Sequence, residues 1–313
     1  MHSPHSPGGR DTETGRIVVS GLTKSYPGFN AVDDLSFTVE PGRVTGFLGP
    51  NGAGKTTTLR MLLGLIFPTA GTATIGGHRY VDLDRPIEVV GAVLEASSAH
   101  RGRTGRNHLR AVCLAAGLPL GRADEMLDLV GLSAAGDRLF KGYSLGMRQR
   151  LGIATAMLGD PHVLILDEPT NGLDPEGIRW MRGLLQGLAA EGRTVLVSSH
   201  LLTEMQALAD DVVILAKGRL VRQGSIAEVT ASIASAHVTV RTPEPAALTD
   251  VLAARGAGVT REHDGTLQVT GVSEAQVGEA AYTAGIAVHH LAAGVADLEE
   301  AFLQLTHEGA QIR

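Results

Sequence analysis

The sequence predicts an α/β fold whose core sheet is mainly parallel, followed by a small α+β domain. Continuous apolar runs of strand length alternate with helical patterns over most of the chain, and such runs suit parallel strands buried on both faces. Beyond residue 235 the composition shifts towards Ala, Val, Thr and Glu. We therefore expect a disordered tail over 1–15, a first domain over 16–235 and a second domain over 236–313.

The elements expected in the first domain are apolar runs and amphipathic patterns that end at Gly, Pro or charged turn residues. The expected strands cover 16–22, 35–39, 44–48, 72–75, 89–94, 162–166, 194–198, 212–216 and 219–222. The expected helices cover 57–65, 109–132 with a break at 117–119, 144–160, 176–190 and 201–209.

One segment of the first domain, 97–112, differs from its surroundings because it is basic. Its arginines lie among Ser, Gly and His, and they are Arg101, Arg103, Arg106 and Arg110. This pattern favours a solvated basic loop. The alternative is a surface that docks a partner.

The second domain has its own order of elements. The expected strands cover 237–241, 258–263, 266–270 and 286–291, and the expected helices cover 245–255, 273–285 and 296–306. The first six elements follow the β-α-β-β-α-β order of ferredoxin-like folds. The segment holds ten acidic residues against four arginines and no catalytic constellation. We expect a regulatory or dimer-supporting domain.

Two local patterns in the second domain bear on helix placement and metal binding. Ser273 and Gln276 have capping-box spacing at the start of an expected helix. His289 and His290 are adjacent, and successive side chains of a strand point to opposite faces, which argues against a shared metal ion.

Composition restricts the class of protein. The chain has 313 residues, a net charge of −6 and one cysteine, Cys113, so an internal disulfide is impossible and the charge argues against a nucleic-acid partner. Apolar runs stay below the roughly 18 residues that cross a bilayer. The first fifteen residues lack a signal-peptide core. We expect a cytosolic protein whose membrane role, if it has one, depends on another chain.

The segment 47–57 carries the most specific motif. Gly49, Gly54, Lys55 and Thr56 fit the pattern G-x-x-x-x-G-K-[ST] between an expected strand and an expected helix. Glycines let backbone N–H groups surround a phosphate, and the helix start adds its positive dipole end. Lys55 would reach the β- and γ-phosphates of a nucleotide, and the Thr56 hydroxyl would hold Mg²⁺. The candidate nucleotide-binding residues of this loop are Gly49, Pro50, Asn51, Gly52, Ala53, Gly54, Lys55, Thr56 and Thr57.

Two adjacent carboxylates follow the buried strand expected at 162–166. Asp167 can hold Mg²⁺ through water beside Thr56, and Glu168 is the candidate general base for an attacking water. A simple cap at the end of a strand is the alternative.

The order of motifs over about residues 16 to 230 resembles the ATP-binding subunits of ABC transporters. In that resemblance Tyr26 matches the aromatic residue that stacks on adenine. Ser144 and Gly146 belong to the family signature. Asp174 lies in the loop that contacts the opposite subunit, and His200 matches the switch histidine that senses the γ-phosphate. Taken alone, Tyr26 also fits a surface turn and His200 a helix start.

The resemblance implies a fold, a reaction and partners. It implies an ABC ATPase domain in which a parallel core is joined by an antiparallel β subdomain and a helical subdomain. ATP would be bound and hydrolysed with Mg²⁺. One chain carries one phosphate loop and one signature, so two composite sites would require a head-to-tail dimer of two copies. A separate integral membrane permease would hold the dimer on the inner face of the cell membrane.

Two positions depart from the family pattern. In the signature, Leu145 and Met147 replace the usual glycine and glutamine. Glu95 stands where the family has a glutamine near Mg²⁺ and the membrane partner, and we expect it to remain a metal-site residue. These departures, the second domain and the ending 297–302 look like the drug- and antibiotic-resistance exporter branch. An importer ATPase and a non-transport ATP switch are the alternatives.

Overall fold

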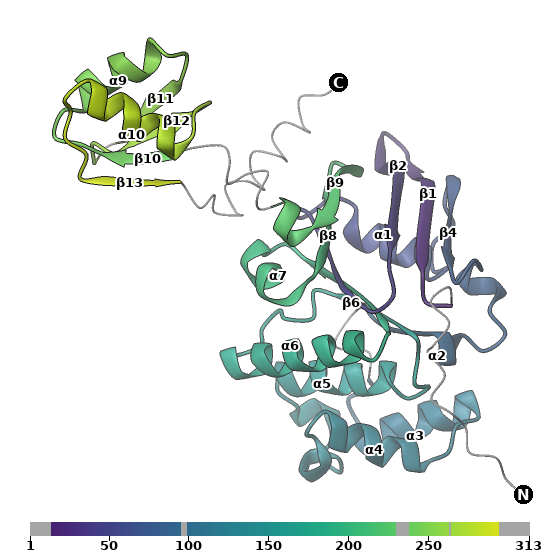
Figure 1. Ribbon diagram of the computed structural model, residues 1–313. Helices are drawn as coiled ribbons and strands as arrows, with labels where there is room; N and C mark the ends of the chain where they lie inside the picture. Colours follow the sequence, from purple (N-terminus) through teal and green to yellow (C-terminus); the bar gives the residue numbers. More distant parts are fainter. Residues whose placement is uncertain (1–13, 95–98, 230–237, 263, 294–313) are drawn as a thin grey trace, which may run out of the picture. The chain divides into compact units, whose positions relative to one another are not determined.

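The computed structural model describes residues 14–94, 99–229, 238–262 and 264–293 (Figure 1). They form two compact units, which divide between Gly224 and Ser225. The second unit thus begins before residue 236, where the sequence places the boundary. At the other end of the first unit, the carbonyl oxygen of the buried Gly15 accepts a hydrogen bond of 2.7 Å from Thr194 Oγ1, so Gly15 belongs with the fold rather than with the expected tail.

A six-stranded sheet with the order β5-β6-β7-β3-β8-β9 forms the core of the first unit. Its strands are β3 (Val44–Leu48), β5 (Val90–Val93), β6 (Val163–Asp167), β7 (Thr194–Ser199), β8 (Asp211–Ala216) and β9 (Arg219–Ser225). The pairs from β5 to β8 are all parallel. Every residue of β3 is buried, because helices and a second sheet cover this core. The mainly parallel core predicted from the continuous apolar runs is confirmed.

The second sheet of this unit is antiparallel, with the order β2-β1-β4. Its strands are β1 (Ile17–Tyr26), β2 (Phe29–Val39) and β4 (Ala70–Ile75). Helix α1 (Lys55–Leu62) contacts both this sheet and β6 of the core. Phe37 of β2 meets Phe47 of β3 with ring centroids 5.2 Å apart, so one apolar core joins the two sheets.

Six further labelled helices of the first unit surround the core sheet (Figure 1). They are α2 (Pro86–Val89), α3 (Gly105–Ala116), α4 (Gly121–Leu129), α5 (Leu145–Ala156), α6 (Pro175–Ala190) and α7 (Leu202–Leu208). Helices α3, α4 and α5 pack together, whereas α6 and α7 pack on β3 and β7. The parallel core, antiparallel sheet and helical region agree with the expected fold class. None of the helices in the described part of the chain has both the length and the apolar character needed to span a bilayer.

The prediction of a basic loop is wrong from Gly105, where α3 begins, and the helix expected from residue 109 thus starts earlier than predicted. Thr104 caps this helix, since its Oγ1 accepts a hydrogen bond of 3.1 Å from Asn107 N. Arg106 forms ion pairs with Asp124 of α4 and, at 2.9 Å, with Asp137. The Arg106 side chain thus binds two neighbouring segments, and the local composition of 97–112 could not indicate these contacts.

In the described residues from Val238 to Ala293, the second unit is an antiparallel sheet with the order β11-β12-β10-β13 and the helices α9 and α10. Its elements are β10 (Val238–Arg241), α9 (Pro245–Ala253), β11 (Gly258–Arg261), β12 (Leu267–Thr270), α10 (Glu274–Thr283) and β13 (His290–Ala293). This chain order and strand order are those of a ferredoxin-like fold. Side chains of the sheet and both helices form a separate apolar core.

Two details of the second unit bear on the sequence predictions. The capping box of Ser273 and Gln276 at the start of α10 is confirmed. The last strand begins at His290 instead of residue 286, because Ile286 N closes the end of α10 with a hydrogen bond of 2.9 Å to Ala281 O. His289 therefore precedes the strand. The expected helix over 296–306 lies outside the described residues.

Candidate nucleotide-binding site

The phosphate loop joins β3 to α1, and two of its glycines are required by the space around them. Gly54 has φ +100°, and a Cβ there would lie 2.5 Å from the carbonyl oxygen of Ala31 in β2. A Cβ on Gly49 would lie 2.7 Å from the carbonyl oxygen of Leu215 in β8. The loop thus passes against two strands where larger residues do not fit, and its backbone N–H groups can face an anion.

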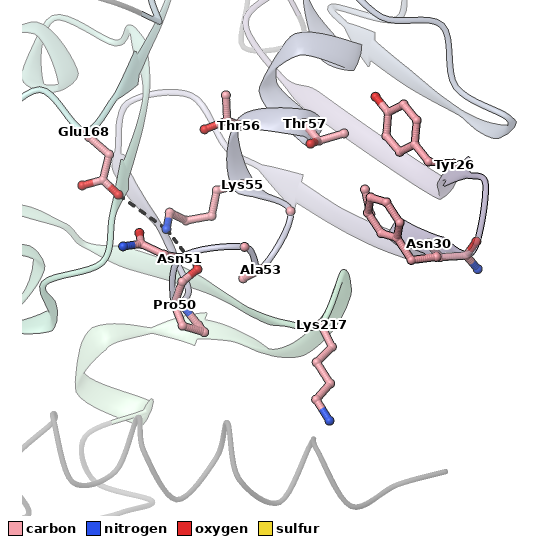
Figure 2. A pocket seen from close by; sticks show the side chains of 14 residues that line it. Tyr26, Asn30, Pro50, Asn51, Ala53, Lys55, Thr56, Thr57, Glu168 and Lys217 are labelled. Carbon is pink, nitrogen blue, oxygen red and sulfur yellow. Dashed lines mark hydrogen bonds and ion pairs between the residues drawn. The ribbon is translucent and has the colours of Figure 1, made fainter.

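Lys55, the first residue of α1, turns back over the loop that precedes it (Figure 2). Its Nζ donates to the carbonyl oxygens of Gly49 at 2.7 Å and Pro50 at 3.4 Å. The same atom lies 3.4 Å from Glu168 Oε1. Only 6% of the side chain is exposed, so this is a cation held among oxygen atoms with little water around it.

Asp167 ends β6 between two hydroxyl groups. Thr56 Oγ1 donates to Asp167 Oδ2 at 2.7 Å, and Ser198 Oγ donates to Asp167 Oδ1. Ser198 is the parallel neighbour of Asp167 on β7, so the register of the sheet creates this contact. The hydroxyl and carboxylate oxygens of Thr56 and Asp167 are hard donors of the kind that Mg²⁺ prefers.

The metal ligands predicted from the sequence are Thr56, Asp167 and Glu95. The structure brings the first two together, whereas Glu95 lies outside the described residues. Within the described ranges, there is no group of three or more His, Cys, Asp and Glu side chains that could bind a metal ion. The pair nevertheless fits Mg²⁺, which usually takes one or two protein oxygens and completes its shell with phosphate oxygens and water.

Glu168 follows Asp167 in a left-handed backbone conformation, with φ +49°. Its N–H group donates to the carbonyl oxygen of Ser198 at 3.2 Å and lies 3.0 Å from Ser198 Oγ. The carboxylate lies between Lys55 and His200, whose Nδ1 is 2.9 Å from Glu168 Oε2. When Glu168 is ionised, Nδ1 carries the proton of this hydrogen bond. Such strained backbone positions of non-glycine residues concentrate at functional sites.

An aromatic pair lies at the other end of the same cleft. The rings of Tyr26, at the end of β1, and Phe29, at the start of β2, are stacked with centroids 5.6 Å apart. Both are exposed, and Lys24 Nζ lies 5.3 Å from the centroid of the Tyr26 ring. The structure places Tyr26 at the end of a strand rather than within a turn, because β1 and β2 continue to pair as far as Tyr26 and Phe29.

The cleft between the aromatic pair and Glu168 has a volume of about 430 Å³. Figure 2 shows the side chains that line it, which come from the end of β1, the start of β2, the phosphate loop, the start of α1, the residue after β6 and the turn after β8. Its apolar end presents ring faces and its polar end a cation, hydroxyl groups and free N–H groups of a helix start. This order suits a nucleoside triphosphate, with the base stacked and the phosphates in the loop.

The sequence analysis missed several residues of this site. Phe29, Asn30 and Lys217 line the cleft, and Ser198 binds the carboxylate of Asp167 and the backbone N–H group of Glu168. Lys217 is brought to the cleft by the turn after β8, where the next residue, Gly218, donates from its N–H group to Ala53 O at 3.0 Å. For Ser198 the available signal was a polar residue ending a buried strand next to the strand of Asp167.

The predicted signature and subunit-contact residues lie at two helix starts. Ser144 caps α5, and its Oγ accepts a hydrogen bond of 3.2 Å from Met147 N. Asp174 caps α6, and its Oδ1 accepts one of 2.8 Å from Gly177 N. Ser144, Gly146 and Asp174 do not line the nucleotide cleft of their own chain. The structure therefore separates the predicted site residues into a cleft group and a helix-start group.

Comparisons with known proteins agree with this geometry. Residues 32–171 match the ABC transporter family, and residues 236–299 match a domain of unknown function (DUF8746). The bacitracin transport ATP-binding protein BcrA of Bacillus licheniformis is 45% identical over 210 residues, covering 66% of this chain and 69% of that protein. The daunorubicin/doxorubicin resistance ATP-binding protein DrrA of Streptomyces peucetius is 35% identical over 316 residues, covering 96% and 95%.

A solved structure shares the fold of the first unit. It is the dimeric, post-hydrolysis state of the ATP-binding cassette MJ0796 bound to ADP and Pi, with 23% identity and a TM-score of 0.61. The match covers 67% of this chain and 98% of that one.

The fold and the cleft define a phosphate-loop ATPase of the α/β class. Within that class the chain belongs to the ATP-binding subunits of ABC transporters, in the branch that includes antibiotic transport and resistance proteins. The family and the fold class predicted from the sequence are thus confirmed.

Proposed function

We propose that this chain hydrolyses ATP to power export of a drug, antibiotic or other small hydrophobic molecule through a separate membrane permease. The observation that carries the proposal is the convergence of Lys55 and His200 on the carboxylate of Glu168, which lines the cleft. Similarity to DrrA along both domains supports the exporter assignment, because it extends beyond the ATPase domain.

The contacts in the cleft support a role for each residue in ATP hydrolysis. Lys55 binds the γ-phosphate, which replaces Glu168 as the anion next to Nζ. Glu168 is then the base that takes a proton from the attacking water, and His200 holds its carboxylate by the Nδ1 hydrogen bond. Thr56 and Asp167 hold Mg²⁺. When bound, Mg²⁺ neutralises charge that develops on the β- and γ-phosphate oxygens.

We infer that two copies bind ATP head to tail. Ser144 and Gly146 lie at a helix start that suits an anion, yet they do not line the cleft of their own chain. A second copy would supply this helix start to the γ-phosphate, and Asp174 would lie at the contact between the copies. ATP then holds the dimer closed, and hydrolysis releases it. No role for nucleic acid is proposed, since the chain has a net charge of −6.

A second groove supports docking of the permease. It has a volume of about 410 Å³, lies among α1, β5 and α5, and is lined by Leu65, Tyr80, Val93 and Gly152, among others. Leu65 is 65% exposed, and an exposed apolar side chain beside a groove suits a partner protein. A permease segment in this groove would keep the chain on the cytoplasmic face of the membrane.

A charge in this groove is expected to uncouple the ATPase from the permease. Leu65→Glu should leave basal ATP hydrolysis unchanged, because Leu65 does not line the nucleotide cleft. It should abolish stimulation by the permease, because a carboxylate in an apolar interface loses its water. The measurement is ATPase activity with and without the permease in lipid vesicles. Leu114→Glu is the matched control, since Leu114 is 70% exposed but lies outside the groove. Equal stimulation of both variants would contradict docking in the groove.

Transport assays test the direction and the class of function. Vesicles that carry the permease, with this chain and ATP on the outer side, should accumulate a hydrophobic drug inside. Movement of substrate out of such vesicles would identify an importer ATPase. Failure to purify with any membrane protein would favour a non-transport ATP switch.

The second domain is proposed to regulate turnover or support the dimer. Among the described residues, the apolar core of the second unit is made of its own side chains, separate from the cluster that joins the two sheets of the ATPase unit. A chain ending at Ser235 should therefore bind ATP as the full chain does, with altered turnover or dimerisation. Titration with a fluorescent ATP analogue measures ATP binding, and sedimentation measures dimerisation. Loss of ATP binding in a truncated chain that retains its helical circular dichroism would show that the second domain completes the site.

A further inference from the structure

The starts of α5 and α6 are joined by two leucine–glycine contacts. A Cβ on Gly172 would overlap Leu145 Cδ2 and lie 3.2 Å from Leu145 Cγ, so the Leu145 side chain covers the backbone of Gly172. In the reverse direction, a Cβ on Gly146 would lie 3.4 Å from Leu173 Cδ2. Each of the two segments thus places a leucine on a glycine of the other. We name this arrangement of Leu145, Gly146, Gly172 and Leu173 the leucine–glycine interlock.

One side of the interlock is firmly held. Thr170 Oγ1 donates to Glu204 Oε2 at 2.6 Å, and Leu173 N donates to Thr170 O at 3.1 Å. Leu173 also packs on α6, since a Cβ on Gly177 would lie 3.3 Å from Leu173 Cβ. The loop 171–174 is therefore fixed to the ATPase core, and Leu145 extends that fixation to the start of α5.

Leu145 itself is not a core residue. It is 47% exposed, and it stands at the position where the family pattern has a glycine. A glycine there would leave the backbone of Gly172 uncovered and free the start of α5 to move relative to the loop. A side chain that restricts such motion lowers the entropy lost when the two segments bind a common partner.

We propose that Leu145 is a positioning residue that holds the signature turn against the loop 171–174. Leu145 thereby keeps the distance between Ser144 and Asp174 constant, so that both residues are in place to contact the second copy of the chain. The proposal rests on the ATP-dependent dimer proposed above and adds the residue that prearranges its contact surface. Neither Leu145 nor Gly172 lines the nucleotide cleft, so the effect concerns dimer closure and not ATP binding to the single chain.

The test uses the full chain carrying Glu168→Gln, in which ATP is bound but hydrolysed slowly. Sedimentation across an ATP titration gives the concentration for half-maximal dimer. Leu145→Gly should raise this concentration by about tenfold, whereas Leu145→Met, which keeps the side-chain volume, should restore it. Binding of ATP by the monomer should stay the same in all variants. In the chain with an intact Glu168, Leu145→Gly should lower kcat with little change in KM.

The second part of the test examines the contact itself. Gly172→Ala should weaken dimerisation, because its Cβ meets Leu145, and Leu145→Ala in the same chain should relieve part of the loss. Gly117→Ala is the matched control for backbone strain, since Gly117 has φ +67° against +73° for Gly172 but nothing within 4 Å of its Cβ. It should leave dimerisation unchanged. Strictly additive effects of the Leu145 and Gly172 substitutions would contradict the interlock.

The outcomes separate this inference from the proposed function. If the Glu168→Gln parent dimerises with ATP but Leu145→Gly does so at the same concentration, Leu145 is an exposed leucine without a positioning role, and the dimer proposal stands. If the parent binds ATP and remains a monomer, the proposed function fails, and the positioning role fails with it.

Discussion

Replacing Lys55 with alanine is expected to remove most of the affinity of the protein for ATP and to reduce turnover by about 10² to 10³-fold, the size of effect seen when a buried donor to a developing charge is lost. The physical reason is that Lys55 Nζ is a nearly buried cation already surrounded by the oxygens of Gly49, Pro50 and Glu168. Without this cation, the negatively charged triphosphate would lie next to the carbonyl oxygens and the Glu168 carboxylate and would be repelled by them. Calorimetric titration with ATP and a turnover assay measure the two losses.

The control for this prediction is Lys141→Ala, because Lys141 is exposed and does not line the cleft. It should bind and hydrolyse ATP as the parent chain does. Thermal unfolding should show both variants folded. Normal turnover in purified Lys55→Ala protein would contradict the assignment of the phosphate loop.

Glu168→Gln is expected to slow hydrolysis by about 10²-fold or more while leaving ATP binding intact, as the loss of a general base does. Glutamine has nearly the same shape as glutamate, so its amide oxygen can still accept a hydrogen bond from Lys55 or His200. It cannot accept a proton from water at neutral pH. Single-turnover kinetics with bound ATP measure the chemical step directly.

A surface carboxylate provides the matched comparison for Glu168→Gln. Glu125 pairs with Arg122 at 2.5 Å on the helical part of the first unit, away from the cleft. Glu125→Gln should leave the single-turnover rate unchanged, since exposed ion pairs contribute little. A Glu168→Gln protein with the parent rate would show that another group, or water alone, takes the proton.

The parts of the cleft that a short stretch of sequence determines could be predicted from the sequence. The strand, loop and helix around Lys55 depend on neighbouring residues only, and the apolar run before Asp167 identified a buried parallel strand. The juxtaposition of Thr56 and Asp167 followed from that, because the ends of parallel strands meet at one edge of a sheet. The family and fold class could therefore be inferred before the structure.

Other features depend on contacts between segments that are distant in the sequence, and local sequence patterns do not predict such contacts. The arginines of α3 suggested a loop because their acidic partners lie on other elements. Ser198 became part of the site only through its register with Asp167. The covering of Gly172 by Leu145 joins residues from two motifs that the sequence analysis treated separately.

The position of the last strand shows a similar limit. The run 286–291 has strand composition, but the end of α10 uses Ile286 to close its final turn. The competition between a helix end and a strand start is decided by packing in three dimensions. The proposed roles of the signature residues likewise require a second chain.

Sedimentation of the Glu168→Gln protein with ATP and Mg²⁺ tests the central claim most directly, namely that ATP is held between two copies. The chain should sediment as a dimer with ATP and as a monomer without it. Adding Gly146→Asp should return the protein to a monomer that still binds ATP, because a carboxylate would occupy the anion position at the start of α5. A Glu168→Gln protein that binds ATP yet remains a monomer would contradict the account, as would a dimer that Gly146→Asp leaves unchanged.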